Sequence, residues 1–148
     1  MSDARHEVEV LSGTGPDDLR WVVICQPGAR GELYTLLRVY SGGDLVVAGS
    51  GFGGPALAPG AVLNEWRGRT GDLPFFVMAR TAPEVDRVVA TTDRGRDVEL
   101  KLSEPVAEFG LRFAAGGLPP GHAPQRLRAE SQGITMETRS QPVPPPRP

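Results

Sequence analysis

The sequence predicts an all-β fold: a single antiparallel β-sandwich of about eight to ten short strands. Composition is the first reason. The 148 residues include 19 Gly and 15 Pro, and inside a helix Gly costs about 1 kcal/mol and Pro about 3 kcal/mol relative to Ala. The second reason is that apolar and polar residues alternate with a period of two in short runs separated by turn residues. A closed β-barrel is the alternative, because alternation alone does not distinguish a barrel from a sandwich.

In the first half of the chain, the alternation predicts four strands. Residues 19–26 are apolar on both faces, which predicts a central strand that is buried on both sides. Residues 41–44, Ser-Gly-Gly-Asp, are a hairpin turn signal. The stretch from Gly49 to Gly60 breaks the pattern and is predicted to be a loop, and residues 61–66 fit either a short helical turn or an extended crossover. The strands expected here cover residues 8–10, 19–26, 33–40 and 45–48.

The second half shows the same alternation more cleanly. Asp93-Arg94-Gly95-Arg96 predicts a tight turn in which Gly95 adopts a positive φ. Residues 140–148 (SQPVPPPRP) are rich in proline and are predicted to be a disordered, polyproline-type tail. The sandwich domain is therefore expected to span residues 1–139. The strands expected here cover residues 75–80, 87–92, 98–102, 109–113, 127–129 and 134–138.

The net charge and the lack of targeting signals exclude several classes of partner and location. The formal net charge is −2, so no basic field is available to collect phosphates, and we expect no nucleic acid as a partner. Cys25 is the single cysteine, which excludes an intrachain disulfide. The N-terminus lacks the apolar region of a signal peptide, and no apolar run approaches the roughly 20 residues that span a bilayer. We therefore expect a cytoplasmic protein that does not bind a membrane.

One glycine pattern resembles a cofactor loop. Gly49, Gly51 and Gly54 satisfy G-x-G-x-x-G after an apolar strand, which looks like the fingerprint of FAD- and NAD-dependent oxidoreductases. That chemistry needs a helix whose N-terminus faces the pyrophosphate. Here Pro59-Gly60 would end such a helix after about one turn. A dinucleotide-binding enzyme is therefore kept only as an alternative that the sequence disfavours, and we expect no cofactor.

No other motif predicts catalysis. Cys25 lies in an apolar strand, where burial raises a thiol pKa and suppresses its reactivity. His6 and His122 have no second ligand at a suitable spacing, whereas a metal site needs three or four converging ligands. We therefore predict neither catalytic nor metal-binding residues.

Residues 73–139 resemble a type of uncharacterised actinobacterial protein with Ig-like β character. The resemblance is carried by strand and turn segments, and it implies an Ig-like β-sandwich and a bacterial source but no catalytic residue. The segments are Pro83-Glu84-Val85-Asp86-Arg87-Val88-Val89, Asp93-Arg94-Gly95-Arg96, Phe109-Gly110-Leu111-Arg112-Phe113, Leu118-Pro119-Pro120-Gly121 and Leu127-Arg128-Ala129.

The function predicted from these observations is that of a non-enzymatic module that binds another protein through loops or an edge strand. The expected contact residues are Phe52, in the glycine-rich stretch, and Trp66, Arg67 and Arg69, in a polar segment. The alternative is a structural component of a homo- or hetero-oligomeric assembly, such as a phage or injection-machine particle. Sandwich sheets offer edges for strand addition in such assemblies.

Overall fold

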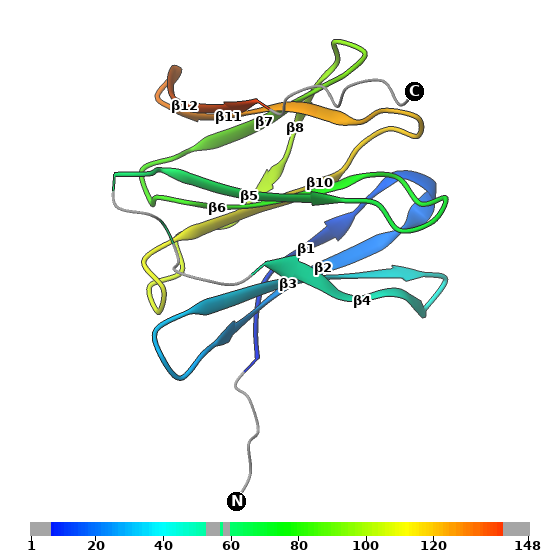
Figure 1. The fold of residues 1–148 in the computed structure, drawn as a ribbon, viewed down its shortest axis with the longest axis horizontal. Helices are drawn as coiled ribbons and strands as arrows, with labels where there is room; N and C mark the ends of the chain where they lie inside the picture. The colour runs from blue at the N-terminus through cyan, green and yellow to red at the C-terminus, as the bar shows by residue number, and fades with distance from the viewer. Residues whose placement is uncertain (1–6, 53–56, 58–59, 141–148) are drawn as a thin grey trace, which may run out of the picture.

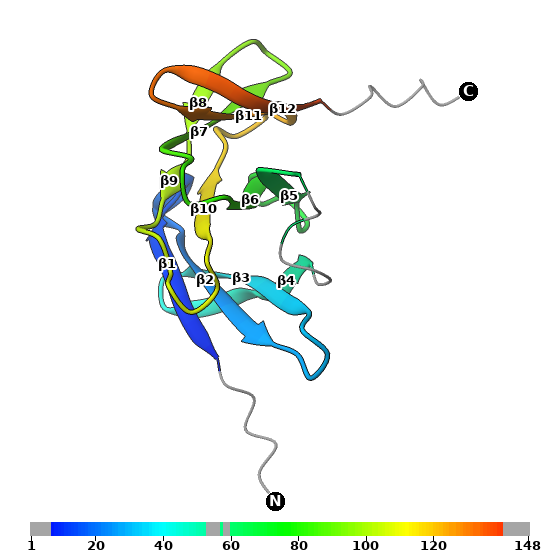
Figure 2. The same cartoon turned by 90° about the vertical axis from the view of Figure 1, so that its left-hand side faces the viewer.

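The chain folds into three stacked antiparallel sheets. A computed structural model describes residues 7–52, 57 and 60–140. The N-terminal sheet has the strand order β1-β2-β3-β4, the middle sheet β5-β6-β10-β9 and the C-terminal sheet β12-β11-β7-β8. They lie one above another, with the C-terminal sheet at the top of Figure 1 and the N-terminal sheet at the bottom, and Figure 2 shows the same order from the side. The strands are β1 (Val8–Thr14), β2 (Arg20–Pro27), β3 (Leu33–Ser41), β4 (Asp44–Phe52), β5 (Leu63–Gly68), β6 (Phe76–Thr81), β7 (Arg87–Thr92), β8 (Asp97–Glu99), β9 (Lys101–Leu102), β10 (Arg112–Gly117), β11 (Pro124–Ser131) and β12 (Ile134–Ser140), with a short 3-10 turn at Pro16–Asp18.

The predicted all-β class is confirmed, and the packing is that of sandwiched sheets. The strand pairs are antiparallel, and none of the three sheets closes into a barrel in the described part of the chain. The structure has twelve strands in three layers, more than the eight to ten of the predicted sandwich. Alternation identifies a strand with one buried face, but it does not say which strands share a sheet.

The middle sheet is covered on both faces. All six residues of β6 are buried, because the C-terminal sheet packs on one side of this strand and the N-terminal sheet on the other. We predicted such a doubly buried strand at residues 19–26, and that prediction is wrong in part. Trp21, Val23, Ile24 and Cys25 of β2 are buried and Val22 is half-buried, but Val22 and Ile24 point away from the middle sheet, and no further sheet covers them in the described structure.

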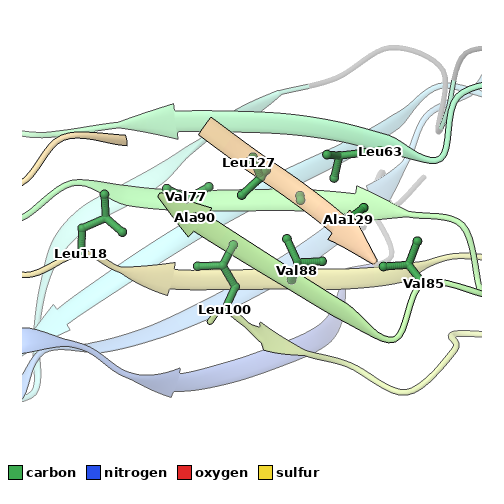
Figure 3. Packing of buried hydrophobic residues seen from close by; sticks show 11 residues of the cluster. Leu63, Val77, Val85, Val88, Ala90, Leu100, Leu118, Leu127 and Ala129 are labelled. Atoms are coloured by element: carbon green, nitrogen blue, oxygen red, sulfur yellow. The ribbon is translucent and has the colours of Figure 1, made fainter. Parts of the chain in front are cut away.

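Between the middle and C-terminal sheets lies an aliphatic core. Figure 3 shows strands of the two sheets crossing obliquely, with leucine, valine and alanine side chains between them. Such packing is the usual way for two sheets to bury their apolar faces. Eleven residues form this cluster: Leu63, Val77, Ala79, Val85, Val88, Ala90, Leu100, Ala114, Leu118, Leu127 and Ala129.

A second core, built around Trp21, joins the middle and N-terminal sheets. The indole packs with Leu37, Phe76 and Met78. Gly13 lies opposite Trp21 in β1, and a Cβ added there would come within 2.5 Å of the indole Cζ2. The missing side chain therefore lets the β1 backbone approach the ring closely.

Several element boundaries differ from the sequence prediction. The strand expected to end at residue 48 continues as β4 to Phe52, and residues 61–66 contribute to a strand, β5, rather than to a helical turn. The strand expected from Phe109 begins only at Arg112, because residues 107–110 form a turn with Gly110 at φ 66°. The turn at Gly95 is confirmed, with φ 76°. Strand β12 includes Ser140, and the predicted tail beyond it lies outside the described residues.

We expect Gly13→Ala to lower the free energy of unfolding by about 1–3 kcal/mol, because the added methyl group collides with a buried indole that has little room to move. Urea denaturation followed by circular dichroism measures the loss. Gly15→Ala is the matched control, since its Cβ would meet the Phe76 ring only at 3.4 Å. A loss at position 13 no larger than that at position 15 would contradict this account of the packing.

Candidate functional site

The two outer faces of the stack have opposite character, and this contrast locates the candidate site. On the C-terminal sheet, Val89 points outward but is only 1% exposed. Ion pairs cross this face around it: Arg87 contacts Glu99 at 3.0 Å and Glu130 at 3.5 Å, and Arg128 contacts Glu130 at 2.7 Å and Asp97 at 3.6 Å. In these four contacts each carboxylate is paired with a guanidinium group. Ion-paired side chains therefore cover the part of this face around Val89.

The outer face of the N-terminal sheet carries apolar residues on both sides of Arg38. Residues paired across β2, β3 and β4 share a face, and the register aligns Ile24 with Leu36, and Tyr40 with Leu45. Leu45 is 49% exposed and Tyr34, which lies on the same face, is 42% exposed. We call this set the outer apolar face, and it consists of Val22, Ile24, Tyr34, Leu36, Tyr40 and Leu45.

A small polar network reaches into the outer apolar face through Arg38, which lies in β3 opposite Val22. Glu7 accepts hydrogen bonds from Nε2 of Gln26 at 2.6 Å and from Nη2 of Arg38 at 3.0 Å. These two bonds hold the pKa of the Glu7 carboxyl below its usual value. The face therefore combines apolar residues with a polar network, a mixture that protein interfaces also show.

The predicted contact residues in β5 have internal contacts. Trp66 is partly buried against the core around Trp21. Arg67 forms an ion pair with Glu65 at 2.7 Å and donates through Nη1 to the Pro124 carbonyl oxygen at 2.9 Å, which ties the middle sheet to the C-terminal sheet. Arg69 lies over the Phe75 ring at 5.1 Å. Whether these side chains also contact a partner stays a prediction.

The glycine pattern lies in an edge strand. Gly49 and Gly51 are part of β4, and Gly51 pairs with Leu36. Gly54 lies outside the described residues, as does the side chain of Phe52, whose backbone ends β4 opposite Thr35. In place of a strand-to-helix turn, the described part of this pattern is therefore extended antiparallel backbone, with no helix N-terminus to meet a pyrophosphate.

A buried polar cluster connects the N-terminal and middle sheets. The fully buried Arg80 of β6 donates through Nη1 to the Leu33 carbonyl oxygen at 2.6 Å and to Oγ1 of Thr35 at 3.3 Å. Thr35 Oγ1 also lies 3.7 Å from Sγ of Cys25. Burial lowers the pKa of Arg80 and raises that of Cys25 to about 11. A thiol with this pKa is a poor nucleophile at neutral pH.

Other titratable groups have structural partners. Nδ1 of His122 lies 2.9 Å from Oγ1 of Thr92, which also accepts the backbone N–H of Arg94 and of Arg96 at 3.2 Å, so this histidine helps to hold two turns together. Within the described ranges, no three His, Cys, Asp or Glu residues are grouped so that they could hold a metal ion. The same ranges contain no helix long and apolar enough to cross a bilayer.

Comparisons with known proteins identify no relative: no family model, curated protein or solved structure matches the chain. The resemblance of residues 73–139 to actinobacterial proteins therefore stays a prediction.

The sequence did contain a signal for the outer apolar face. Residues 19–26 are apolar at alternate positions of both faces, which we interpreted as burial on both sides. In a sheet at the surface of the stack, the same pattern produces one core face and one exposed apolar face. Only the position of the sheet in the stack distinguishes these outcomes.

We expect the Cys25 thiol to react with a disulfide reagent such as DTNB at least about 100-fold more slowly in the folded protein than after denaturation. The reason is that its pKa rises from 9.0 to about 11, which reduces the thiolate fraction about 100-fold at a given pH. Absorbance of the released thiolate at pH 8, with and without guanidinium, measures the two rates. Comparable rates would contradict the burial of this thiol.

The ion-pair network of the C-terminal sheet predicts a loss of stability in acid. A hydrogen bond from Thr91 and the nearby Arg128 lower the folded-state pKa of Asp97 below 3.8. Its stabilising contribution is therefore present above the unfolded-state pKa and disappears as the pH falls through the folded-state pKa. We expect Asp97→Asn to lower the urea midpoint at pH 7 and to lose this effect progressively below 3.8. Asp72→Asn, in the exposed turn after β5, controls for the loss of one negative charge.

Proposed function

We propose that this protein is a non-enzymatic binding module that contacts another protein through its outer apolar face. The observation that supports this proposal is the difference between the two outer faces of the stack. One carries ion pairs over Val89, and among the described residues its sheet exposes large apolar side chains only in the edge strand β12, at Ile134 and Met136. The other leaves Leu45 and Tyr34 nearly half exposed. Exposed apolar groups bordered by polar ones mark interaction surfaces on folded proteins.

The form of this surface supports docking by a face rather than by the β4 edge. Register shifts interrupt β4 between its partners Leu37 and Arg38, and again between Val39 and Tyr40. Such bulges disturb the regular row of backbone groups that an added strand would need. The partner we infer is therefore a flat apolar surface, such as another sheet.

The charged groups around the outer apolar face also indicate which kind of partner surface fits it. Acidic and basic groups both lie beside the apolar residues of this face. The acidic groups are Glu9 and Asp44, and the basic groups are Arg20 and Arg38. A partner with both signs at its own border complements such a surface better than a strongly charged one. The same surface on a second copy of this chain meets that description, as would the neighbouring subunit of an assembly.

We expect Leu45→Glu to weaken partner binding at least about tenfold, because a carboxylate at a buried apolar contact loses its hydration. The measurement is affinity purification from the native host, followed by calorimetry with the purified partner. Sedimentation velocity over a concentration series compares the self-association of the wild type with that of Leu45→Glu. Leu45 is already 49% exposed, so the substitution leaves the core intact.

Ile134→Glu is the matched control for that experiment. It places the same charge at an apolar position that is 70% exposed, but in the first residue of β12, in the C-terminal sheet. The control variant should bind as the wild type does. Equal affinities of the two variants, for a partner or for a second copy, would contradict the placement of the interface on the outer apolar face.

A further inference from the structure

A groove runs along the free edge of β1 and separates this strand from residues 96–106. Four cavities of about 510, 420, 560 and 530 Å³ follow one another along it, and each is lined by residues of both segments. The segments run in opposite directions, because Val8 shares a cavity with Val106 and Pro16 shares one with Arg96. Figure 2 shows β1 beside β9 at this side of the molecule. In the described structure the two strands belong to different sheets and do not pair.

After the register shift between Glu9 and Leu11, the β1 wall of the groove carries a regular row of backbone groups suited to a further strand. The N–H of Gly15 donates to the Leu19 carbonyl oxygen at 2.7 Å. Residues of an antiparallel strand face their partner alternately, so Gly13 and Gly15 direct their backbone groups to β2. Ser12 and Thr14 direct theirs to the groove.

The opposite wall reaches across the groove through one side chain. Lys101 of β9 donates from Nζ to the Ser12 carbonyl oxygen at 2.6 Å. This bond confirms that the Ser12 carbonyl faces the groove. The lysine is exposed and its side chain flexible, so a competing donor can replace it at this oxygen.

The cavity of about 510 Å³ at the middle of the groove is cationic. Arg20 and Lys101 line it together with the hydroxyl groups of Ser12, Thr14 and Tyr40, and its described lining includes no carboxylate. Trp21 also contributes to the lining, and its Nε1 is buried without a hydrogen-bond partner. An anionic group complements this set of donors.

We propose that the groove binds an extended peptide segment that carries an acidic side chain. The segment adds to the free edge of β1 as a further strand, and its backbone N–H takes the place of Lys101 at the Ser12 carbonyl oxygen. The released Lys101 and the neighbouring Arg20 bind the carboxylate of the peptide. Backbone pairing supplies affinity in this mode of recognition, and the cationic cavity supplies the preference for an acidic residue.

This site differs from the outer apolar face in its ligand, although Val22 and Tyr40 belong to that face and also line the cavity of about 510 Å³. Leu45 lies in β4, at the opposite edge of the N-terminal sheet from β1. Lys101 belongs to β9 of the middle sheet, so Lys101→Glu leaves every residue of the outer apolar face unchanged. Failure of one proposal can thus be distinguished from failure of the other.

The test begins with a displayed library of random peptides of about seven residues, the length of β1, selected on the purified full-length chain. We expect enrichment of peptides with Asp or Glu near the centre and without proline there, since proline lacks the N–H for pairing. Calorimetry with an enriched peptide then compares the wild type with Lys101→Glu. We expect at least about tenfold weaker binding, since hydrogen bonds between charged groups are lost. A lysine in place of the peptide's acidic residue should restore binding to the Lys101→Glu variant.

Two further variants separate the groove from general effects. Thr14→Pro removes a backbone N–H that faces the groove but no bond to β2, and it should also weaken binding. Arg126→Glu makes the same kind of charge reversal at an exposed position on the outer side of β11 and should bind as the wild type does. The proposal is overturned if no peptide is enriched, if enriched peptides lack an acidic residue, or if Lys101→Glu and Arg126→Glu bind equally well.

Discussion

The burial of the middle sheet on both faces is the constraint on which the rest of this structure depends. All six residues of β6 are buried, so each face of this sheet must match a separate partner sheet. The side toward the C-terminal sheet meets an aliphatic core, and the side toward the N-terminal sheet meets Trp21 and its neighbours. Arg80 is the charged residue of this strand, and its hydrogen bonds to Leu33 and Thr35 help to stabilise a buried charge while linking β6 to β3. A stack with a covered centre leaves two outer faces, and their side chains decide what the molecule presents to its surroundings.

The two contact surfaces that we propose, the outer apolar face and the groove beside β1, differ in their chemistry. The outer apolar face offers flat hydrophobic area, whereas the groove beside β1 offers backbone groups and the cations Arg20 and Lys101. On the C-terminal sheet the charged side chains around Val89 pair with one another, and exposed apolar side chains are those of Ile134 and Met136 in the edge strand β12. Both contact surfaces therefore include the N-terminal sheet, while the other two sheets support it and connect it to the rest of the chain.

Some elements of the structure could be predicted from the sequence, and others could not. Strand β7 and the turn at Gly95 were predictable, because β-branched residues and a glycine with positive φ are local signals. Strand β5 was ambiguous, since the polar residues around Trp66 suggest a solvated segment. In the structure its side chains lie between two sheets, where Arg67 bonds to the Pro124 carbonyl oxygen. The groove could not be predicted, because its walls, residues 8–16 and 96–106, are far apart in the chain.

The sequence by itself determined that the chain forms short antiparallel strands with frequent turns, because alternation and the positions of Gly and Pro act through local backbone preference. It also determined that Cys25 sits in an apolar strand. Tertiary structure alone decided that there are three sheets, that β6 rather than β2 lies between two other sheets, and that Tyr34 and Leu45 are left exposed on an outer face. The physical reason is that an alternating strand specifies two faces, whereas the element that covers each face comes from a distant part of the chain.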